Sequence, residues 1–314
     1  MNSKERSWDV QEISDNGERV SHLNQDSVYY AHLSIYDFAA PFCQGATVLD
    51  AGSGAGYGSA FLADKGAKHV LGIDVSEKAI EFSRQHFNRP NLSFQTMSLE
   101  QMESLPSQHF DLIYSSNTLE HVPNVASFMR EAWRVLKPTG VLLLAVPPIT
   151  DDRLLYLNIT NQYHVNIWTP RQWEYTLGLF FQEIEPFLHG VVRAGADFSP
   201  EHFTPASTLT EKDFVFERGT VGDMYRQFTL TAIFVARKPR LETQIPTADT
   251  PLKFVDESFT RPQGYIDPAI RTRLSKYFEM PTIPFTVPAD GNGEKTGVRN
   301  KVKTALARVW RKFQ

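Results

Sequence analysis

The stretch "VLDAGSGAGYG", Val48 to Gly58, decides how this chain folds. It reads as a strand that ends in an acid and is followed by glycines at every second position. A strand, a glycine-rich turn and a helix start form a pocket in which backbone N–H groups approach a ligand closely. The stretch therefore predicts a ligand-binding turn inside an α/β fold.

The spacing of these glycines excludes two common phosphate sites. A dinucleotide fingerprint has glycines at relative positions 0, 2 and 5, and here the third position falls on Tyr57, Ser59 or Phe61. A Walker loop needs Gly-Lys-Ser or Gly-Lys-Thr after the turn, and neither follows. Asp50 agrees with this, because a carboxylate repels a pyrophosphate and attracts a cation.

The two acids that flank the turn suit S-adenosylmethionine. This cofactor carries an ammonium and a sulfonium, which Asp50 attracts. Asp74 ends the next apolar run, "VLGID", where a carboxylate can accept both hydroxyls of a ribose. The alternative interpretation is a glycine-rich turn beside an acid that faces solvent.

From about residue 47 to 238 the chain alternates β-rich runs with helical patterns, which is typical of a parallel sheet covered by helices. Seven strands are expected, at Thr47–Leu49, His69–Ile73, Leu92–Gln95, Asp111–Ser115, Val141–Val146, Gln182–Phe187 and Thr229–Ala236. Helices are expected at Ser27–Phe42, Tyr57–Lys65, Glu77–Phe87, Val125–Leu136 and Pro170–Leu179. The pattern predicts a doubly wound α/β domain with helices on both faces.

The domain organisation follows from where this alternation stops. Residues 1–46 are expected to form a helical cap, and residues 47–238 the main domain with insertions at 147–168 and 189–226. Both insertions follow late strands, where loops usually shape a substrate site. Residues 239–297 are punctuated by prolines and predict an extended tail. Residues 298–314 predict an amphipathic basic helix, suited either to an anionic membrane surface or to a docking partner.

Composition excludes several classes of protein. With 41% hydrophobic and 22% charged residues the chain is globular, and a net charge of −4 gives no global basic field for nucleic acid. Cys43 is the single cysteine, so no internal disulfide forms. The first residues lack a secretory signal, and no apolar run reaches the roughly 18 residues of a membrane span. We expect a cytoplasmic protein, with residues 298–314 able to bring it to the inner membrane face.

Four stretches resemble, in order, the motifs of class I S-adenosylmethionine-dependent methyltransferases, within their type 11/23 group. The stretches are VLDAGSGAGYG, VLGIDVS, FDLIYSSNTLEHV and RVLKPTGVLLLAVP. The resemblance covers about residues 47 to 237 and implies a seven-stranded Rossmann-like sheet. It implies that the final strand, expected at Thr229–Ala236, is antiparallel. It also implies S-adenosylmethionine as the cofactor.

The resemblance implies which residues hold this cofactor. The glycines would line its methionine and ribose, Asp74 would hold the ribose hydroxyls, and Asn117 would face the methionine end. The predicted set is Asp50, Gly52, Ser53, Gly54, Gly56, Asp74, Val75, Ser98, Leu99 and Asn117. Ser98 stands where the family usually has an Asp for the adenine amino group. The adenine contact is therefore open between Leu99, Met97 and Glu100.

The heptapeptide "NTLEHVP", residues 117–123, follows the fourth predicted strand and supplies the candidates for catalysis. An imidazole such as that of His121 suits removal of a proton from an acceptor hydroxyl. We predict His121, Glu120 and the later His164 as catalytic residues. The alternative is that Asn117 caps a helix and Glu120 with His121 only orients a loop.

A metal is the third reading of this stretch. Ubiquinone-type O-methyltransferases and small-RNA 2′-O-methyltransferases, which the region resembles, carry E-x-x-E-H here and a further His later. Asn117 replaces the first of these acids, and an amide in place of a carboxylate weakens Mg²⁺ binding. We therefore predict no metal, and His164 as an unmetallated base or substrate ligand.

The acceptor is indicated only by a softer resemblance, to methyltransferases of bacterial cell-surface glycan and secondary-metabolite pathways. It favours methyl transfer to a hydroxyl of a sugar, a glycan or a small metabolite. The net charge and the lack of a long basic stripe in the catalytic region disfavour a nucleic-acid acceptor. The alternative function is a non-catalytic module that binds the cofactor or a related nucleoside within a biosynthetic complex.

Overall fold

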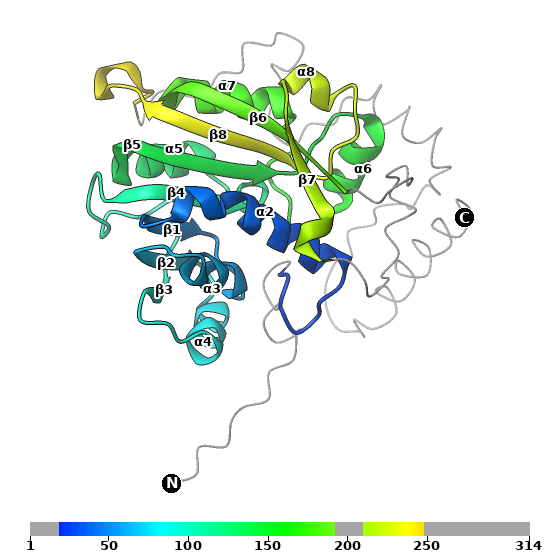
Figure 1. Cartoon of the computed structure of the whole chain (residues 1–314). Coiled ribbons are helices and arrows are strands. Elements are labelled where there is room, and N and C mark those ends of the chain that lie inside the picture. The colour runs from blue at the N-terminus through cyan, green and yellow to red at the C-terminus, as the bar shows by residue number, and fades with distance from the viewer. Residues whose placement is uncertain (1–18, 192–209, 248–314) are drawn as a thin grey trace, which may run out of the picture.

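The computed structural model describes residues 19–191 and 210–247, which form a mixed sheet between two layers of helices (Figure 1). The expected basic helix 298–314 and most of the tail 239–297 lie outside these residues. The described strands are β1 (Thr47–Ala51), β2 (His69–Asp74), β3 (Leu92–Thr96), β4 (Phe110–Ser116), β5 (Leu136–Val146), β6 (Phe181–Val191), β7 (Phe214–Arg218) and β8 (Ala232–Pro239). The described α-helices are α2 (Ser27–Cys43), α3 (Tyr57–Asp64), α4 (Glu77–His86), α5 (Val125–Val135), α6 (Asp152–Thr160), α7 (Pro170–Phe180) and α8 (Val221–Met224).

The strand order, β3-β2-β1-β4-β5-β8-β6-β7, places a topological switch point between β1 and β4. The first five strands run parallel. From β1 the chain goes outward to β2 and β3, then returns to β4 on the other side of β1. In open parallel sheets ligands bind outside the carboxyl ends of the strands at such a point. The glycine turn follows β1 and Asn117 follows β4, so both predicted motifs reach this edge.

The doubly wound fold class and the antiparallel final strand are confirmed. Strand β8 runs antiparallel to both of its neighbours, β5 and β6. The prediction of seven strands is wrong, because eight pair within the described residues. The missed strand is β7, inside the expected insertion 189–226. Strand β7 spans only five residues, too few for a clear periodic pattern. It is held by hydrogen bonds to β6 and by the stacking of Phe38 on Phe216, and both partners lie far from it in sequence.

Two further differences concern local periodicity. Helix α6 lies within the expected insertion 147–168, where Asp151 caps its first turn by accepting from the Leu154 N–H at 2.8 Å. Strand β5 begins at Leu136 instead of Val141, because its pairing with β4 shifts register between the Phe110 and Leu112 positions. Such an irregularity adds residues to one strand without a regular alternation, so the pattern hides it.

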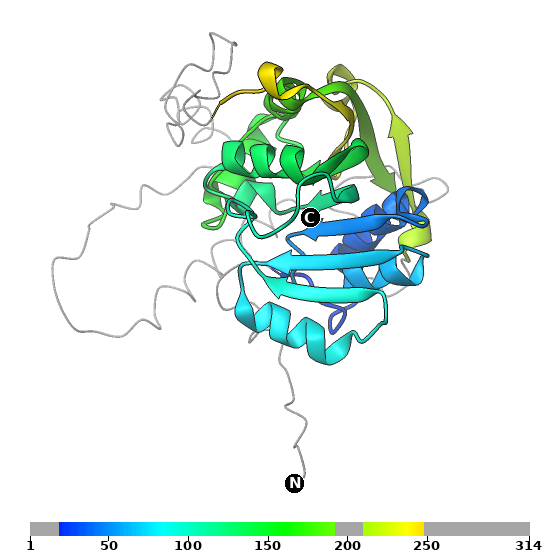
Figure 2. The same ribbon diagram turned by 90° about the vertical axis from the view of Figure 1, so that its left-hand side faces the viewer.

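The helices divide between the two faces of the sheet. Buried apolar residues of α5, α7 and α8 gather in one cluster, and those of α2, α3 and α4 in another. Figure 2 shows the blue helix α2 and the green helices α5 and α7 on opposite sides. Among the residues described, no helix has the length and apolar character needed to cross a lipid bilayer.

Helix α2 is fixed to the sheet through buried polar contacts as well as apolar ones. The Ser34 hydroxyl donates to the Ala31 carbonyl at 2.7 Å and lies 3.0 Å from Nε2 of His189 on β6. The His189 ring is fully buried and stacks on Phe216 with centroids 4.8 Å apart. Burial, with a smaller contribution from His32, lowers the pKa of His189 from 6.5 to about 3.

This burial predicts a pH dependence of stability. Between pH 6.5 and about 3, His189 is protonated in the unfolded chain and neutral in the folded chain. The contribution of the neutral ring is thus complete above pH 6.5 and is lost as the pH falls. From about pH 6 to about pH 4 the free energy of unfolding should fall by up to ~1.4 kcal/mol per pH unit more in the wild type than in His189→Phe. Urea denaturation at several pH values measures both curves, and parallel curves would refute this assignment.

Candidate functional site

A cavity of about 1020 Å³ opens at the carboxyl ends of β1, β2 and β4. Most of the predicted site residues line it. These are Gly52, Ser53, Gly54, Asp74, Val75, Ser98, Leu99, Asn117, Glu120, His121 and His164. Two predicted residues, Asp50 and Gly56, are not among its lining residues. The cavity therefore joins the predicted cofactor motifs to the predicted catalytic residues.

The glycine turn wraps one end of the cavity. The N–H groups of Gly52 and Ser53 both donate to the Ile73 carbonyl at 2.9 Å, which ties the turn to the end of β2. Gly52 and Gly54 have φ angles of +94° and +52°, a region that favours glycine. A Cβ at Gly54 would have no atom within 4 Å, so the cavity passes directly over this residue.

Asp74 is oriented by several donors. Its Oδ2 accepts from the Gly54 N–H at 3.0 Å, and its Oδ1 accepts from the Ser76 N–H at 2.9 Å. The Arg19 guanidinium also donates to Oδ1, at 3.3 Å. Sequence reasoning did not find Arg19, because it precedes helix α2 by several residues and carries no motif.

Asp50 lies behind the turn, with 1% of its surface exposed. It accepts hydrogen bonds from Ser59 of α3 at 2.5 Å and from the Tyr36 hydroxyl of α2 at 3.3 Å. Burial raises the pKa of Asp50 to about 7, while the two hydrogen bonds oppose the rise. Asp50 thus joins β1 to both helices, and a positive ligand above it favours its ionised form.

The end of the cavity next to β3 has an apolar rim. Leu99 is 7% exposed and Val75 is 73% exposed. Glu100, which sequence reasoning kept as an alternative adenine contact, accepts from the Asn124 N–H at 2.5 Å through one oxygen. That bond commits part of this carboxylate to the start of α5.

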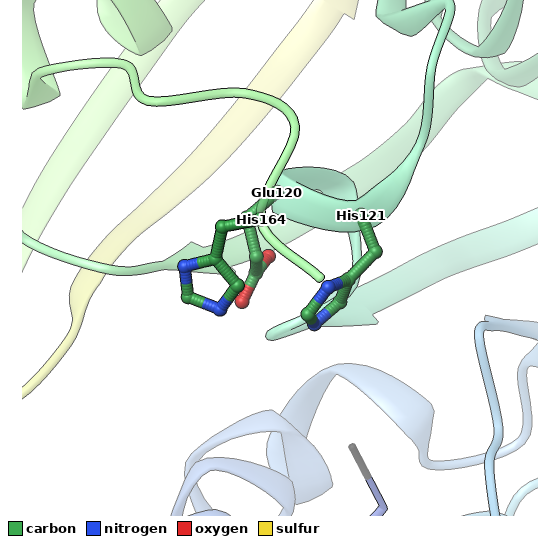
Figure 3. Close-up of side chains that lie close together, drawn as sticks. All are labelled: Glu120, His121 and His164. Carbon is green, nitrogen blue, oxygen red and sulfur yellow. The ribbon is translucent and has the colours of Figure 1, made fainter. Parts of the chain in front are cut away.

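Glu120, His121 and His164 converge at the opposite end (Figure 3). One ligand atom from each lies within 4.8 Å of those of the others. The imidazole rings of His121 and His164 meet edge to face with centroids 4.9 Å apart. The Glu120 side chain is buried, with 2% exposed. Tertiary structure has thus brought His164 beside Glu120 and His121, which lie more than forty residues earlier in the sequence.

Asn117 caps neither η1 nor α5, because Thr118 is the N-cap of η1 and Asn124 is that of α5. The Asn124 side chain accepts from the Ser127 N–H at 3.1 Å. Asn117 has a φ of +48°, lines the cavity, and donates through its amide to the Ser116 hydroxyl at 3.1 Å. The short helix η1 (Leu119–His121) follows it and carries Glu120 and His121.

Two buried asparagines at this end escaped sequence reasoning. Asn158 of α6 and Asn166 of the next loop are 7% and 2% exposed. Asn158 contacts His164, and Asn166 contacts the backbone of η1. The single signal in the sequence is an excess of Asn between positions 158 and 166, which is also usual in turns.

Comparison with known proteins agrees with this geometry. A family model described as a methyltransferase domain matches residues 49–144. A "Probable S-adenosylmethionine-dependent methyltransferase" of Mycolicibacterium smegmatis is 32% identical over 133 residues, 42% of this chain and 50% of that protein. A ubiquinone biosynthesis O-methyltransferase of Pseudomonas paraeruginosa is 38% identical over 122 residues, 38% of this chain and 52% of that protein.

The chain contains a class I S-adenosylmethionine-dependent methyltransferase domain. It spans about half the length of the two relatives named above. The fold of this domain is shared with a methyltransferase structure from Archaeoglobus fulgidus, at 19% identity and a TM-score of 0.50, over 66% of this chain and 93% of that one. The family implies S-adenosylmethionine as the cofactor.

The lining of the methyltransferase domain fits that cofactor. Among the described residues, Ser53 is one whose buried hydroxyl has no hydrogen-bond partner, and it lines the cavity. A buried hydroxyl of this kind is expected to pair with a ligand. The open space over Gly54 and the carboxylate of Asp74 lie on the same turn, where a ribose needs close backbone approach and two acceptors.

The other end of the methyltransferase cavity has a donor set that a metal can use. Two imidazoles and one carboxylate suit first-row divalent ions such as Zn²⁺, Mn²⁺ or Fe²⁺. Each imidazole is also held at Nδ1 by an oxygen of the protein, an arrangement common among metal ligands.

Gly54 provides a test of the cofactor position. Gly54→Ala should cost about 1–2 kcal/mol of stability from the left-handed backbone, and its methyl group should also block the cofactor. Gly45→Ala is the matched control, because Gly45 has a φ of +70°, has nothing within 4 Å of its Cβ position, and does not line the cavity. Calorimetric titration should show weaker S-adenosylmethionine binding for Gly54→Ala alone. Equal affinities for both variants would place the cofactor elsewhere.

Proposed function

We propose that this chain transfers a methyl group from S-adenosylmethionine to a hydroxyl oxygen of a sugar, a glycan or a small metabolite. The observation that carries the proposal is that one continuous cavity joins the glycine turn and Asp74 to the His121–His164 pair. A cofactor pocket alone would suit a binding module. A pair of imidazoles at its far end suits proton removal from an acceptor.

The charges of the cavity support a neutral acceptor. Arg19 is the single Lys or Arg among the described residues that line it, and Arg19 is paired with Asp74. The acceptor end instead carries Glu120, which repels phosphate or carboxylate groups. Polar uncharged groups, among them Asn161 and Tyr163, line the same end and suit hydroxyl-rich molecules. The O-methyltransferase relative supports oxygen as the methylated atom.

The chemistry divides between the cofactor and the chain. When bound, S-adenosylmethionine supplies the methyl group, whose bond to sulfur breaks as its bond to the acceptor oxygen forms. His121 takes the proton that the hydroxyl loses, and His164 orients the hydroxyl or replaces His121 as base. The buried Glu120 carboxylate stabilises the resulting imidazolium. Most of the remaining effect comes from holding the acceptor close to the methyl group.

A divalent cation is the second candidate for activating the acceptor, and the close approach of Glu120, His121 and His164 favours it. These three residues would hold the ion, which would lower the pKa of a bound hydroxyl. Exhaustive chelation followed by addition of Zn²⁺, Mn²⁺ or Mg²⁺ separates the two mechanisms. Activity that survives chelation supports imidazole catalysis alone, and activity that returns only with metal supports the cation.

Asp74→Asn tests the cofactor half of the proposal. The amide keeps the shape of the carboxylate but loses its charge and one acceptor oxygen, and hydrogen bonds to charged groups contribute about 1.5–3 kcal/mol. Titration should therefore show S-adenosylmethionine bound about 10-fold or more weakly. Asp64→Asn makes the same change in an exposed ion pair with Arg89 and should bind normally. No binding by the wild type would end both the enzyme and the binding-module interpretations.

His121→Ala tests the catalytic half. Loss of the base should lower kcat by roughly 10²–10⁴-fold while the affinity for S-adenosylmethionine stays unchanged. His109→Ala is the control, because His109 is exposed and does not line the cavity. Transfer of a labelled methyl group to a panel of neutral sugars and hydroxylated metabolites is the measurement. Full turnover in His121→Ala would show that "NTLEHVP" has only a structural role. Cofactor binding by the wild type without transfer to any acceptor would favour the binding module.

A further inference from the structure

The loop between α6 and α7 is attached to η1 by a dense set of hydrogen bonds. The N–H groups of Val165 and Asn166 donate to the Glu120 carbonyl at 2.8 and 3.0 Å. The Asn166 side-chain amide donates to the carbonyls of Leu119 at 2.8 Å and Val122 at 2.6 Å. These bonds join two segments that come from opposite sides of β5 in the chain, and each segment carries one of the two histidines.

Asn158 contacts the ring of His164 through its side-chain oxygen. Its Nδ2 donates to the Leu154 carbonyl at 2.7 Å, which leaves Oδ1 as the atom that faces His164. Nδ1 of His164 lies 2.7 Å from that oxygen. An amide oxygen only accepts, so Nδ1 must carry the proton, and the lone pair of the neutral ring belongs to Nε2.

The same reasoning applies to His121 through a different acceptor. Its Nδ1 lies 2.9 Å from the Tyr163 carbonyl oxygen, which also only accepts. Tyr163 belongs to the attached loop, three residues before Asn166. The proton of His121 is therefore held by a carbonyl whose position depends on the attachment of that loop to η1.

We propose that Asn158 and Asn166 are positioning residues that hold both histidines in the Nδ1–H tautomer. Asn158 acts on His164 directly, through its acceptor oxygen. Asn166 acts on His121 indirectly, since its N–H groups hold the loop that carries the Tyr163 carbonyl. Both rings then offer Nε2, as a base or as a ligand atom, to the cavity that they line. The proposal rests on the proposed function for what Nε2 does, but the tautomers can be measured without turnover.

Asn158 faces His164 through its amide oxygen, whereas Asn166 holds η1 through its amide N–H groups, so an Asn→Asp change distinguishes the two residues. Asn158→Asp keeps an oxygen for His164 and should preserve the tautomer. Asn166→Asp removes both side-chain N–H donors and should loosen the attachment of the loop to η1, leaving the backbone hydrogen bonds to the Glu120 carbonyl in place. Asn158→Leu, which has no acceptor, should free the His164 ring to return toward the mixture of tautomers that it has in water.

The experiment is ¹⁵N–¹H correlation of the imidazole groups in the full chain, at a pH where the rings are neutral. His121→Gln and His164→Gln assign the signals among the nine histidines. We expect the Nδ1–H pattern for both rings in the wild type and in Asn158→Asp. We expect its loss at His164 alone in Asn158→Leu and at His121 in Asn166→Asp. An Nε2–H pattern in the wild type, or no change in either disruptive variant, would overturn the proposal.

Kinetics supply the second readout. Asn158→Leu should lower kcat roughly 10–100-fold, as loss of such partners commonly does, with unchanged affinity for S-adenosylmethionine. Asn158→Asp should restore most of the rate. If Asn158→Leu does not fold, the wild-type spectrum and Asn158→Asp still decide the question. Absence of methyl transfer in the wild type would refute the proposed function and leave the tautomer result intact.

Discussion

The two ends of the cavity can pack closely against each other because Gly52 has no side chain. The Gly52 N–H donates to the Ile73 carbonyl, which ties the turn to β2, and its φ is +94°. On the other side, the Thr118 side chain occupies the space that a Cβ at Gly52 would need. Thr118 directly precedes η1, which carries Glu120 and His121. A larger residue at position 52 would push apart the cofactor turn and the catalytic segment, so their spacing depends on this glycine.

Helix α2 packs over two buried titratable side chains, and their burial disfavours the charged forms. Within three residues it contributes Ser34 beside His189 and Tyr36 beside Asp50. Burial favours the neutral form of both His189 and Asp50. Each pairing satisfies a polar atom that would otherwise be buried alone. The lowered pKa of His189 opposes its protonation, and the raised pKa of Asp50 opposes its ionisation. The α2 interface therefore favours the neutral form of both side chains. A positively charged ligand over Asp50 would instead favour the ionised form of that carboxyl group.

The acceptor end is built differently from the cofactor end. The glycine turn depends on backbone geometry within one βα unit, whereas Glu120, His121 and His164 depend on side chains and loops from two distant segments. Hydrogen bonds from Asn166 and the Val165 backbone replace the rigidity that a single element would give. This division agrees with a domain that keeps its cofactor chemistry while loop changes alter the acceptor.

The sequence by itself determined the parallel core, the glycine turn, Asp74 and the place of "NTLEHVP", because each rests on local periodicity or on spacing inside one βα unit. It also ranked Glu120, His121 and His164 as candidates, but not their approach to one another. Only tertiary structure decided that approach, the edge strand β7, the role of Asn124 as the true cap, and the buried contacts of Arg19, Asn158 and Asn166. The physical reason is that these features are made between segments far apart in the chain, where hydrogen bonds and packing leave no periodic pattern in the sequence.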